Sequence, residues 1–164
     1  MSFYAPTEIE EIIKGAKEAI NVNIEGLEKT GNRLGREFSC DSRGRMPTIT
    51  WTPFEGAKSY AIISYDPDAP IGVFYHLATY NIPPNMTRLT HEDLKKTTVL
   101  PNSGGRRDWY PLCPPRGHGT HRYYFLVLAL NEQITINLRS IEDLVRASKG
   151  KILAYGWNMG TYSR

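Results

Sequence analysis

Hydrophobic residues along this chain follow two different periods. Near the N-terminus they recur every three or four residues, the spacing of one helix face, at Ile9, Ile12, Ile13, Ala16 and Ile20. Thr7 followed by Glu10 is a capping-box pattern, in which a Thr side chain closes the first turn of a helix. We therefore predict a short amphipathic helix over about residues 8–20.

After residue 20 the pattern changes to the alternation of β-branched and aromatic residues that is typical of strands. The predicted strands cover residues 21–32 (including a turn that contains Gly), 48–52, 59–65, 76–82, 121–130 and 151–162. The strand at 121–130 is apolar on both faces, which indicates a central place in a sheet. A second helix is predicted from its cap at Ser140 to Gly150. The fold class is therefore mainly β.

Residues 83–119 show only weak periodicity, and a loop of that length inside a compact domain is usually functional. Proline is concentrated in two segments, one that leads into this stretch and one within it. Eight of the eleven prolines fall between residues 66 and 84 or between 101 and 115. Because proline fixes its own φ angle and restricts the residue before it, these two segments are predicted to be stiff.

Length and charge exclude several classes of protein. A chain of 164 residues fits one domain, predicted to span 1–164, and leaves no room for a second enzyme-sized one. The net charge of +3 is too small for a nucleic-acid partner, which needs a basic face that neutralises several phosphates. No apolar stretch approaches the ~20 residues of a membrane span, and no secretory leader is visible. We expect a cytoplasmic protein without a transmembrane segment.

The two cysteines, Cys40 and Cys113, do not form a disulfide framework by themselves. In a reducing compartment both are expected to be free thiols. A Cys40–Cys113 disulfide is the alternative that the sequence leaves open.

The first segment with candidate chemistry is Asp66-Pro67-Asp68-Ala69-Pro70, which directly follows a predicted strand. His76 begins the next strand, so two carboxylates and an imidazole are expected at one end of a sheet. The alternative is a proline-rich turn with two solvated aspartates.

The second segment runs from Asp108 through Tyr110, Pro114 and Pro115 into the strand at 121–130. Strand alternation places His121 and Tyr123 on the same face. Taken alone, His121 also fits a satisfied core histidine.

Two further features of this segment bear on ligand binding. Gly117 and Gly119 allow the backbone to approach a ligand closely. His118, which lies between them, is expected to be exposed and without a role.

Together these residues predict a small anion pocket. Histidine N–H and tyrosine O–H groups donate to phosphate, sulfate or carboxylate oxygens, and an aspartate fixes the histidine tautomer. Three of the four histidines lie in these segments, which makes a metal site an alternative. The sequence has no Cys-x-x-Cys or His-Glu-x-x-His motif to support it. We predict no metal and no cofactor.

Asp-Pro-Asp-Ala-Pro, His76 and Pro-Pro-Arg-Gly-His-Gly-Thr-His-Arg-Tyr occur here in the order and at the separation typical of one family. The chain resembles the phosphatidylethanolamine-binding proteins, which include the Raf kinase inhibitor proteins, and specifically their prokaryotic and archaeal branch. The resemblance covers about residues 35–164 and leaves residues 1–30 as an N-terminal helix and strand extension. It implies an antiparallel β-sandwich with a few peripheral helices, and a cis bond at Ala69–Pro70.

The resemblance also implies which residues bind the ligand. The positions that match the family's pocket are Asp66, His76, Tyr110, Pro114, Pro115, His121 and Tyr123. Asp68 belongs to the same motif and is expected to shape its turn, and Gly117 completes the predicted set.

Two functions from different classes follow. The first is a module that binds phosphate, a phospholipid headgroup or a carboxylate-type anion and acts as a protease inhibitor or signalling modulator through protein contacts. Its partner surface is expected at residues 102–116, where Arg106, Arg107 and Trp109 are of types that anchor interfaces. The alternative is a small acid–base enzyme in which His76 or His121 is the base and Asp66 orients it. A non-enzymatic protein is favoured, and a homodimer is compatible with the sequence.

Overall fold

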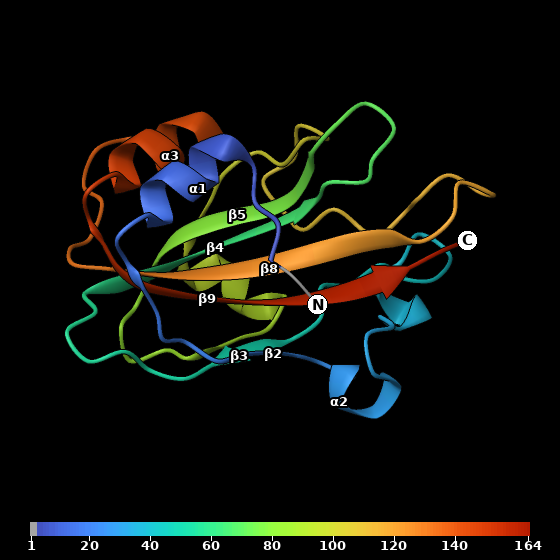
Figure 1. The fold of residues 1–164 in the computed structure, drawn as a ribbon, viewed down its shortest axis with the longest axis horizontal. Helices are drawn as coiled ribbons and strands as arrows, with labels where there is room; N and C mark the ends of the chain where they lie inside the picture. The colour runs from blue at the N-terminus through green and yellow to red at the C-terminus, as the bar shows by residue number, and fades with distance from the viewer. Residues whose placement is uncertain (1–2) are drawn as a thin grey trace.

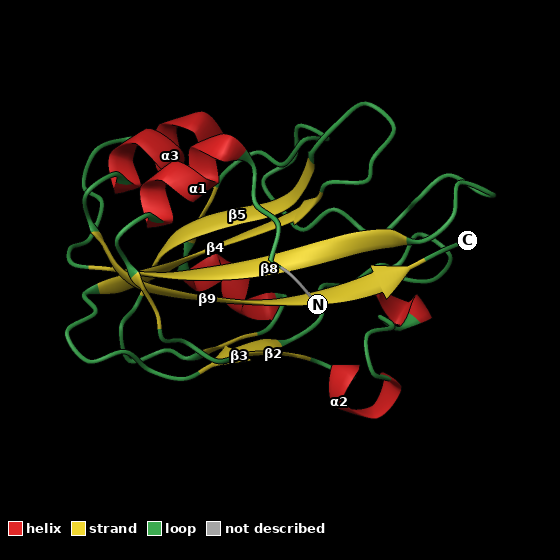
Figure 2. Ribbon diagram, in the orientation of Figure 1, coloured by secondary structure: helices red, strands yellow, loops and turns green. Residues whose placement is uncertain are grey.

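Strand pairing arranges the chain in two sheets over residues 3–164, which are those that the computed structural model describes (Figures 1 and 2). The larger sheet has six strands in the order β1 (Lys17–Glu18), β9 (Ile152–Tyr162), β8 (His121–Leu130), β4 (Ser59–Asp66), β5 (Phe74–Ile82) and β7 (Thr98–Val99). The smaller has three, in the order β2 (Val22–Ile24), β3 (Ile49–Trp51) and β6 (Arg88–Leu89). All neighbours pair antiparallel except β1 with β9. The predicted mainly β, antiparallel fold is confirmed.

The larger sheet is covered on both faces, which explains the apolar character of its central strand. Figure 1 shows α1 (Thr7–Ile13) and α3 (Ile141–Ser148) on one face and the smaller sheet on the other. Along β8, Tyr123 and Phe125 pack in the core between the sheets, whereas Tyr124 and Leu126 pack beneath the helices. The predicted alternation of this strand is therefore confirmed, and it fixes which of its residues face the small sheet.

The second predicted helix is also confirmed. The Ser140 hydroxyl accepts a hydrogen bond from the Asp143 N–H at 3.1 Å and so closes the first turn of α3. The remaining helical segments are short: α2 (Leu27–Thr30) and the 3-10 turns η1 (Arg36–Phe38) and η2 (Glu92–Lys96).

The N-terminal helix is shorter than predicted and lacks the predicted cap. Thr7 is its first residue, and no side chain accepts a capping hydrogen bond from its first turn. The chain leaves the helix at Lys14 with an extended conformation, and Gly15 follows at a φ of 87°. Residues 17–18 then pair with β9 instead of continuing the helix.

Two other expectations need correction. The strand predicted over 21–32 ends after Ile24, because the chain turns at Gly26 (φ 87°) into α2. The stretch over 83–119, predicted as a loop, contains β6, η2 and β7 before the irregular segment that leads to β8. Among the described residues, no helix is long and apolar enough to cross a bilayer.

Cys40 and Cys113 form a disulfide, so the expectation of two free thiols is wrong. The segments that carry them run side by side: Leu112 N–H donates to the Phe38 carbonyl at 3.0 Å and Cys40 N–H donates to the Leu112 carbonyl at 2.9 Å. These two hydrogen bonds bring the two cysteines, 73 residues apart, within bonding distance.

Loss of the disulfide is predicted to destabilise the fold. A cross-link over a separation of 73 residues restricts the unfolded chain strongly. We expect Cys40→Ser to lower the free energy of unfolding, measured by urea titration under oxidising conditions, by about 2–4 kcal/mol. Adding a reductant should destabilise the wild-type protein and leave the variant unchanged. Equal stability of wild type and variant would contradict this.

Truncation of a buried side chain of α1 is predicted to lower the free energy of unfolding as much as a mutation elsewhere in the core. Ile9 is completely buried against the larger sheet. Ile9→Ala should lower the free energy of unfolding by about 2–4 kcal/mol, whereas Glu11→Ala, on the exposed face, should change it little. If both variants unfold like the wild type, the helix is an accessory segment and not part of the core.

Candidate functional site

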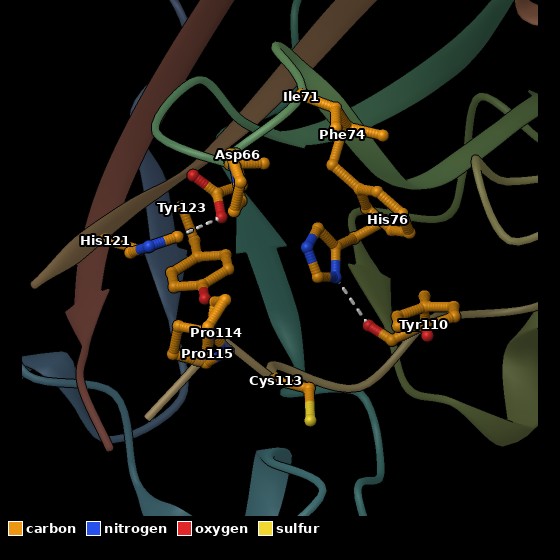
Figure 3. Close-up of a pocket in the computed structure, with 12 residues that line it drawn as sticks. Asp66, Ile71, Phe74, His76, Tyr110, Cys113, Pro114, Pro115, His121 and Tyr123 are labelled. Carbon is orange, nitrogen blue, oxygen red and sulfur yellow. Dashed lines mark hydrogen bonds and ion pairs between the residues drawn. The ribbon is translucent and has the colours of Figure 1, made fainter. Parts of the chain in front are cut away.

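A cavity of about 280 Å³ opens at the end of the larger sheet where β4 ends and β5 and β8 begin (Figure 3). Its lining comes from those strand ends, from the loop between β4 and β5, and from the long segment before β8: Asp66, Ala69, Pro70, Ile71, Phe74, His76, Tyr110, Cys113, Pro114, Pro115, His121 and Tyr123. The two proline-rich segments of the sequence therefore form opposite walls of one cavity.

A buried carboxylate–imidazole pair forms the floor of this cavity. Asp66, the last residue of β4, and His121, the first of β8, are 3% and 1% exposed. The His121 Nδ1–H donates to Asp66 Oδ2 at 2.6 Å, as Figure 3 shows. Burial raises the pKa of Asp66, although the bond from His121 and the N–H of Asp68 at 2.7 Å oppose this. Both side chains of the pair are therefore held by hydrogen bonds within the protein.

His118 extends this pair toward solvent, which the sequence did not predict. Its Nδ1 lies 2.7 Å from Nε2 of His121, and its side chain is exposed. Three side chains thus form a hydrogen-bonded row from the surface to the cavity. No local pattern indicates this contact, because a loop running into a strand does not fix which way residue 118 points.

A β-bulge aims His76 into the cavity. Ser64 pairs with Leu77 and Tyr65 with Tyr75, so His76 has no partner on β4. The extra residue bends the strand and turns an additional side chain toward the small-sheet side. The sequence predicted a strand that begins at His76, but β5 begins two residues earlier, at Phe74.

The hydrogen bond of His76 fixes its tautomer. Its Nδ1 lies 2.7 Å from the carbonyl oxygen of Tyr110, and since a carbonyl can only accept, Nδ1 carries the proton. Burial lowers the pKa of His76 to about 4, so the ring is neutral at pH 7. Nε2, which points into the cavity in Figure 3, is therefore a hydrogen-bond acceptor.

Tyr123, which is 1% exposed, lines the wall opposite His76. Its hydroxyl is a proton donor with no hydrogen-bond partner among the described residues. Burial raises the pKa of Tyr123 far above its ordinary value, which keeps the hydroxyl protonated. Over residues 3–164, no group of three His, Cys, Asp or Glu side chains is arranged to hold a metal ion.

A disulfide and an ion pair hold the Pro114–Pro115 wall in place. Cys113 is bonded to Cys40, and the Arg164 guanidinium contacts the Pro114 carbonyl at 3.4 Å while pairing with Asp41 at 3.0 Å. The hydrogen bonds from Arg164 and Tyr162 hold the pKa of Asp41 below its usual value. The wall is therefore fixed by a disulfide, which reaches the cavity lining through Cys113, and by an ion pair that lies outside the lining.

Comparison with known proteins agrees with this architecture. The model of the phosphatidylethanolamine-binding protein family matches residues 27–163. This chain belongs to that family. A UPF0098 protein of Aquifex aeolicus is 39% identical over 146 residues, covering 83% of this chain and 84% of the relative. UPF0098 protein YbcL of Escherichia coli is 37% identical over 133 residues, covering 71% of this chain and 73% of the relative.

Solved structures show the same fold. A phosphatidylethanolamine-binding protein homologue from Chlamydia trachomatis, CT736, superposes with a TM-score of 0.82 at 28% identity, covering 90% of this chain and 99% of its own. The crystal structure of E. coli YbcL gives a TM-score of 0.77 at 28% identity, covering 88% of this chain and 98% of its own. The family and its prokaryotic and archaeal branch, which the sequence motifs indicated, are confirmed.

Of the nine predicted site residues, the phosphatidylethanolamine-binding protein fold brings seven together in the cavity: Asp66, His76, Tyr110, Pro114, Pro115, His121 and Tyr123. Asp68 does not line it. Its carboxylate pairs with the Arg122 guanidinium at 2.8 Å and accepts the Arg122 N–H at 2.9 Å, which lowers the pKa of Asp68. Gly117 also lies outside, with its N–H directed to the Arg164 carbonyl at 3.3 Å.

Two further expectations from this part of the sequence are corrected. The Ala69–Pro70 bond is trans, as are the other peptide bonds of residues 3–164. Trp109, expected on a partner surface, is buried and stacks on Phe125 with ring centroids 6.0 Å apart. It supports the core beneath His76 instead, with its ring 5.6 Å from the imidazole.

The sequence did not assign the apolar rim of the cavity. Pro70, Ile71 and Phe74 line its mouth, and Ile71 is 93% exposed. Proline and an aliphatic residue in a turn carry no signal for ligand contact, because the same residues occur in turns without a role.

The buried neutral state of His76 predicts a pH dependence of stability. Its pKa of about 4 in the folded protein is below the ordinary 6.5, so the stability it contributes is present above pH 6.5 and is lost as the pH falls toward 4. We expect this residue to account for a loss of about 2–3 kcal/mol between pH 7 and 4.5 in urea unfolding.

The matched control is His76→Gln, whose side chain does not titrate. Its free energy of unfolding should fall less than that of the wild type over the same pH range. A loss of equal size in both proteins would assign the acid sensitivity to other groups.

Proposed function

We propose that this protein binds a small phosphate-type anion in the cavity and acts by binding and not by catalysis. The observation that carries the proposal is a cavity with apolar and aromatic walls whose few polar groups, the Asp66–His121 pair and the Tyr123 hydroxyl, are buried and fixed in place. Ligand pockets commonly combine such walls with a few fixed polar groups that orient the ligand. A volume of about 280 Å³ suits a phosphoryl or carboxyl group with a small substituent.

The polar groups of the cavity narrow the ligand chemistry. The Tyr123 hydroxyl can donate to an oxyanion, whereas Nε2 of His76 can only accept. A ligand that satisfies both has an anionic oxygen and a proton donor close together, such as a singly protonated phosphate. Inorganic phosphate and a phospholipid headgroup with an ammonium group fit this description, whereas a carboxylate would satisfy the Tyr123 hydroxyl alone.

The geometry supports a binding role better than the enzyme alternative. His121 and Asp66 do form a base–orienter pair, but the second nitrogen of His121 is engaged by His118. Cys113 is the one sulfur in the described lining, and it is part of a disulfide, so it has no thiolate to act as a nucleophile. No Ser or Thr hydroxyl is among the described lining residues.

We further propose that protein partners, a protease or a signalling protein among them, meet the rim of the cavity. Arg116, which follows Pro115 of the lining, is exposed, as is Ile71 on the facing loop, and Arg106 is exposed in the segment that leads to Tyr110. Exposed apolar and arginine side chains around a pocket are typical of contact surfaces.

Phosphate titration calorimetry tests the anion site. The wild-type protein should bind inorganic phosphate at pH 6.5, and Tyr123→Phe, which removes the donor and keeps the ring, should weaken binding about tenfold or more. His91→Gln, which changes a histidine that is bonded to Asp108 and is not part of the cavity lining, should bind as the wild type does. Wild-type protein that shows no binding, or a Tyr123→Phe variant that binds equally well, would contradict the proposal.

A further inference from the structure

His118 is a surface residue in hydrogen-bond contact with the buried floor of the cavity. We propose that it is a positioning residue that holds a proton on the Asp66–His121 pair, so that the pocket takes up its anion together with that proton. This inference rests on the proposed anion site and adds to it a residue and a pH dependence.

The geometry forms one continuous row. His118 Nδ1 lies 2.7 Å from His121 Nε2, and His121 Nδ1 lies 2.6 Å from Asp66 Oδ2. The outer end of the row is exposed and the inner end is almost completely buried. The backbone at both sides of His118 supports this position, since Gly117 and Gly119 adopt φ angles of 76° and 94° that other residues rarely adopt.

Hydrogen-bond rules define two protonation states of the row. Two ring nitrogens in hydrogen-bond contact share one proton. In the first state His118 Nδ1–H donates to His121 Nε2, His121 is neutral, and the Asp66–His121 pair carries a charge of −1. In the second, a proton has bound at the exposed Nε2 of His118 and the shared proton has moved to Nε2 of His121. The added charge then resides on His121, and its pair with Asp66 is neutral overall.

The difference in charge between the two states affects anion binding because Asp66 itself lines the cavity. An anion that enters beside an uncompensated carboxylate is repelled in a medium of low dielectric constant, whereas a neutral pair removes that repulsion. His118 stabilises the second state because its Nδ1 accepts the hydrogen bond of the His121 imidazolium.

The other ionisable groups near the pair are already neutral or paired. His76 of β5 is neutral, because burial lowers its pKa to about 4, and Tyr123 of β8 stays protonated. Asp68 pairs with Arg122 at 2.8 Å, and the Tyr162 hydroxyl of β9 donates to Asp41, which also pairs with Arg116 at 3.5 Å and with Arg164. The row from His118 to Asp66 is therefore the part of the site in which one bound proton changes the charge beside the cavity.

The test compares three proteins in calorimetric titrations with inorganic phosphate between pH 5.5 and 8. They are the wild type, His118→Ala, which removes the acceptor, and His118→Asn, whose Oδ1 can take the place of Nδ1. Phosphate itself titrates in this range, but equally for all three, so the ratio of their Kd values isolates the protein. His91→Asn, a histidine change outside the cavity, is the control.

We expect the Kd of His118→Ala to match that of the wild type at pH 5.5 and to exceed it by about three- to tenfold at pH 7.5. His118→Asn should restore most of the difference. A ratio that does not change with pH would overturn the proposal, as would an Asn variant that behaves like the Ala variant. Absence of phosphate binding in the wild type at every pH would instead contradict the anion site itself.

Discussion

The double coverage of the six-stranded sheet is the constraint on which the rest of the molecule depends. With helices on one face and the small sheet on the other, β4 and β8 run through the core with almost no place for a polar side chain. A buried polar group is costly unless it is hydrogen-bonded, and among the described residues of β4 only the Ser64 hydroxyl is buried without a partner. The floor of the cavity obeys this rule at the strand ends, where Asp66 and His121 satisfy each other and reach the surface through His118. The polar groups of the site therefore lie at the strand ends, where the buried core stops.

Rigidity around the site comes from segments far apart in the sequence. The wall of Pro114 and Pro115 is stiff by composition, but its position is set by the disulfide to Cys40 and by the Arg164–Asp41 ion pair. Because Arg164 and Asp41 lie outside the cavity lining, their ion pair fixes the wall without adding charge to the side that faces the ligand. A pocket built this way is preorganised, so little conformational entropy is lost when a ligand binds.

Much of the fold could be predicted from local sequence patterns. The helical spacing and the strand alternation of apolar residues both indicate which side chains are buried. The strand at 121–130 and the Ser140 cap are examples, because each depends on neighbouring residues only. The N-terminal helix was predicted too long because the apolar spacing continues past Gly15, where the backbone changes direction and Ile20 packs against β9 instead.

The site was predictable in composition but not in detail. Asp66, His121 and Tyr123 could be placed together because they lie at strand ends with a defined face. His118, the disulfide and the bulge at His76 depend on contacts between segments, which no local pattern encodes. The bulge also makes the shape of the cavity mouth independent of the packing of the core. It shifts the register of β5 at His76, so a change of length in the preceding turn does not rotate Leu77 out of the core. The mouth can therefore change in shape while the interior stays the same.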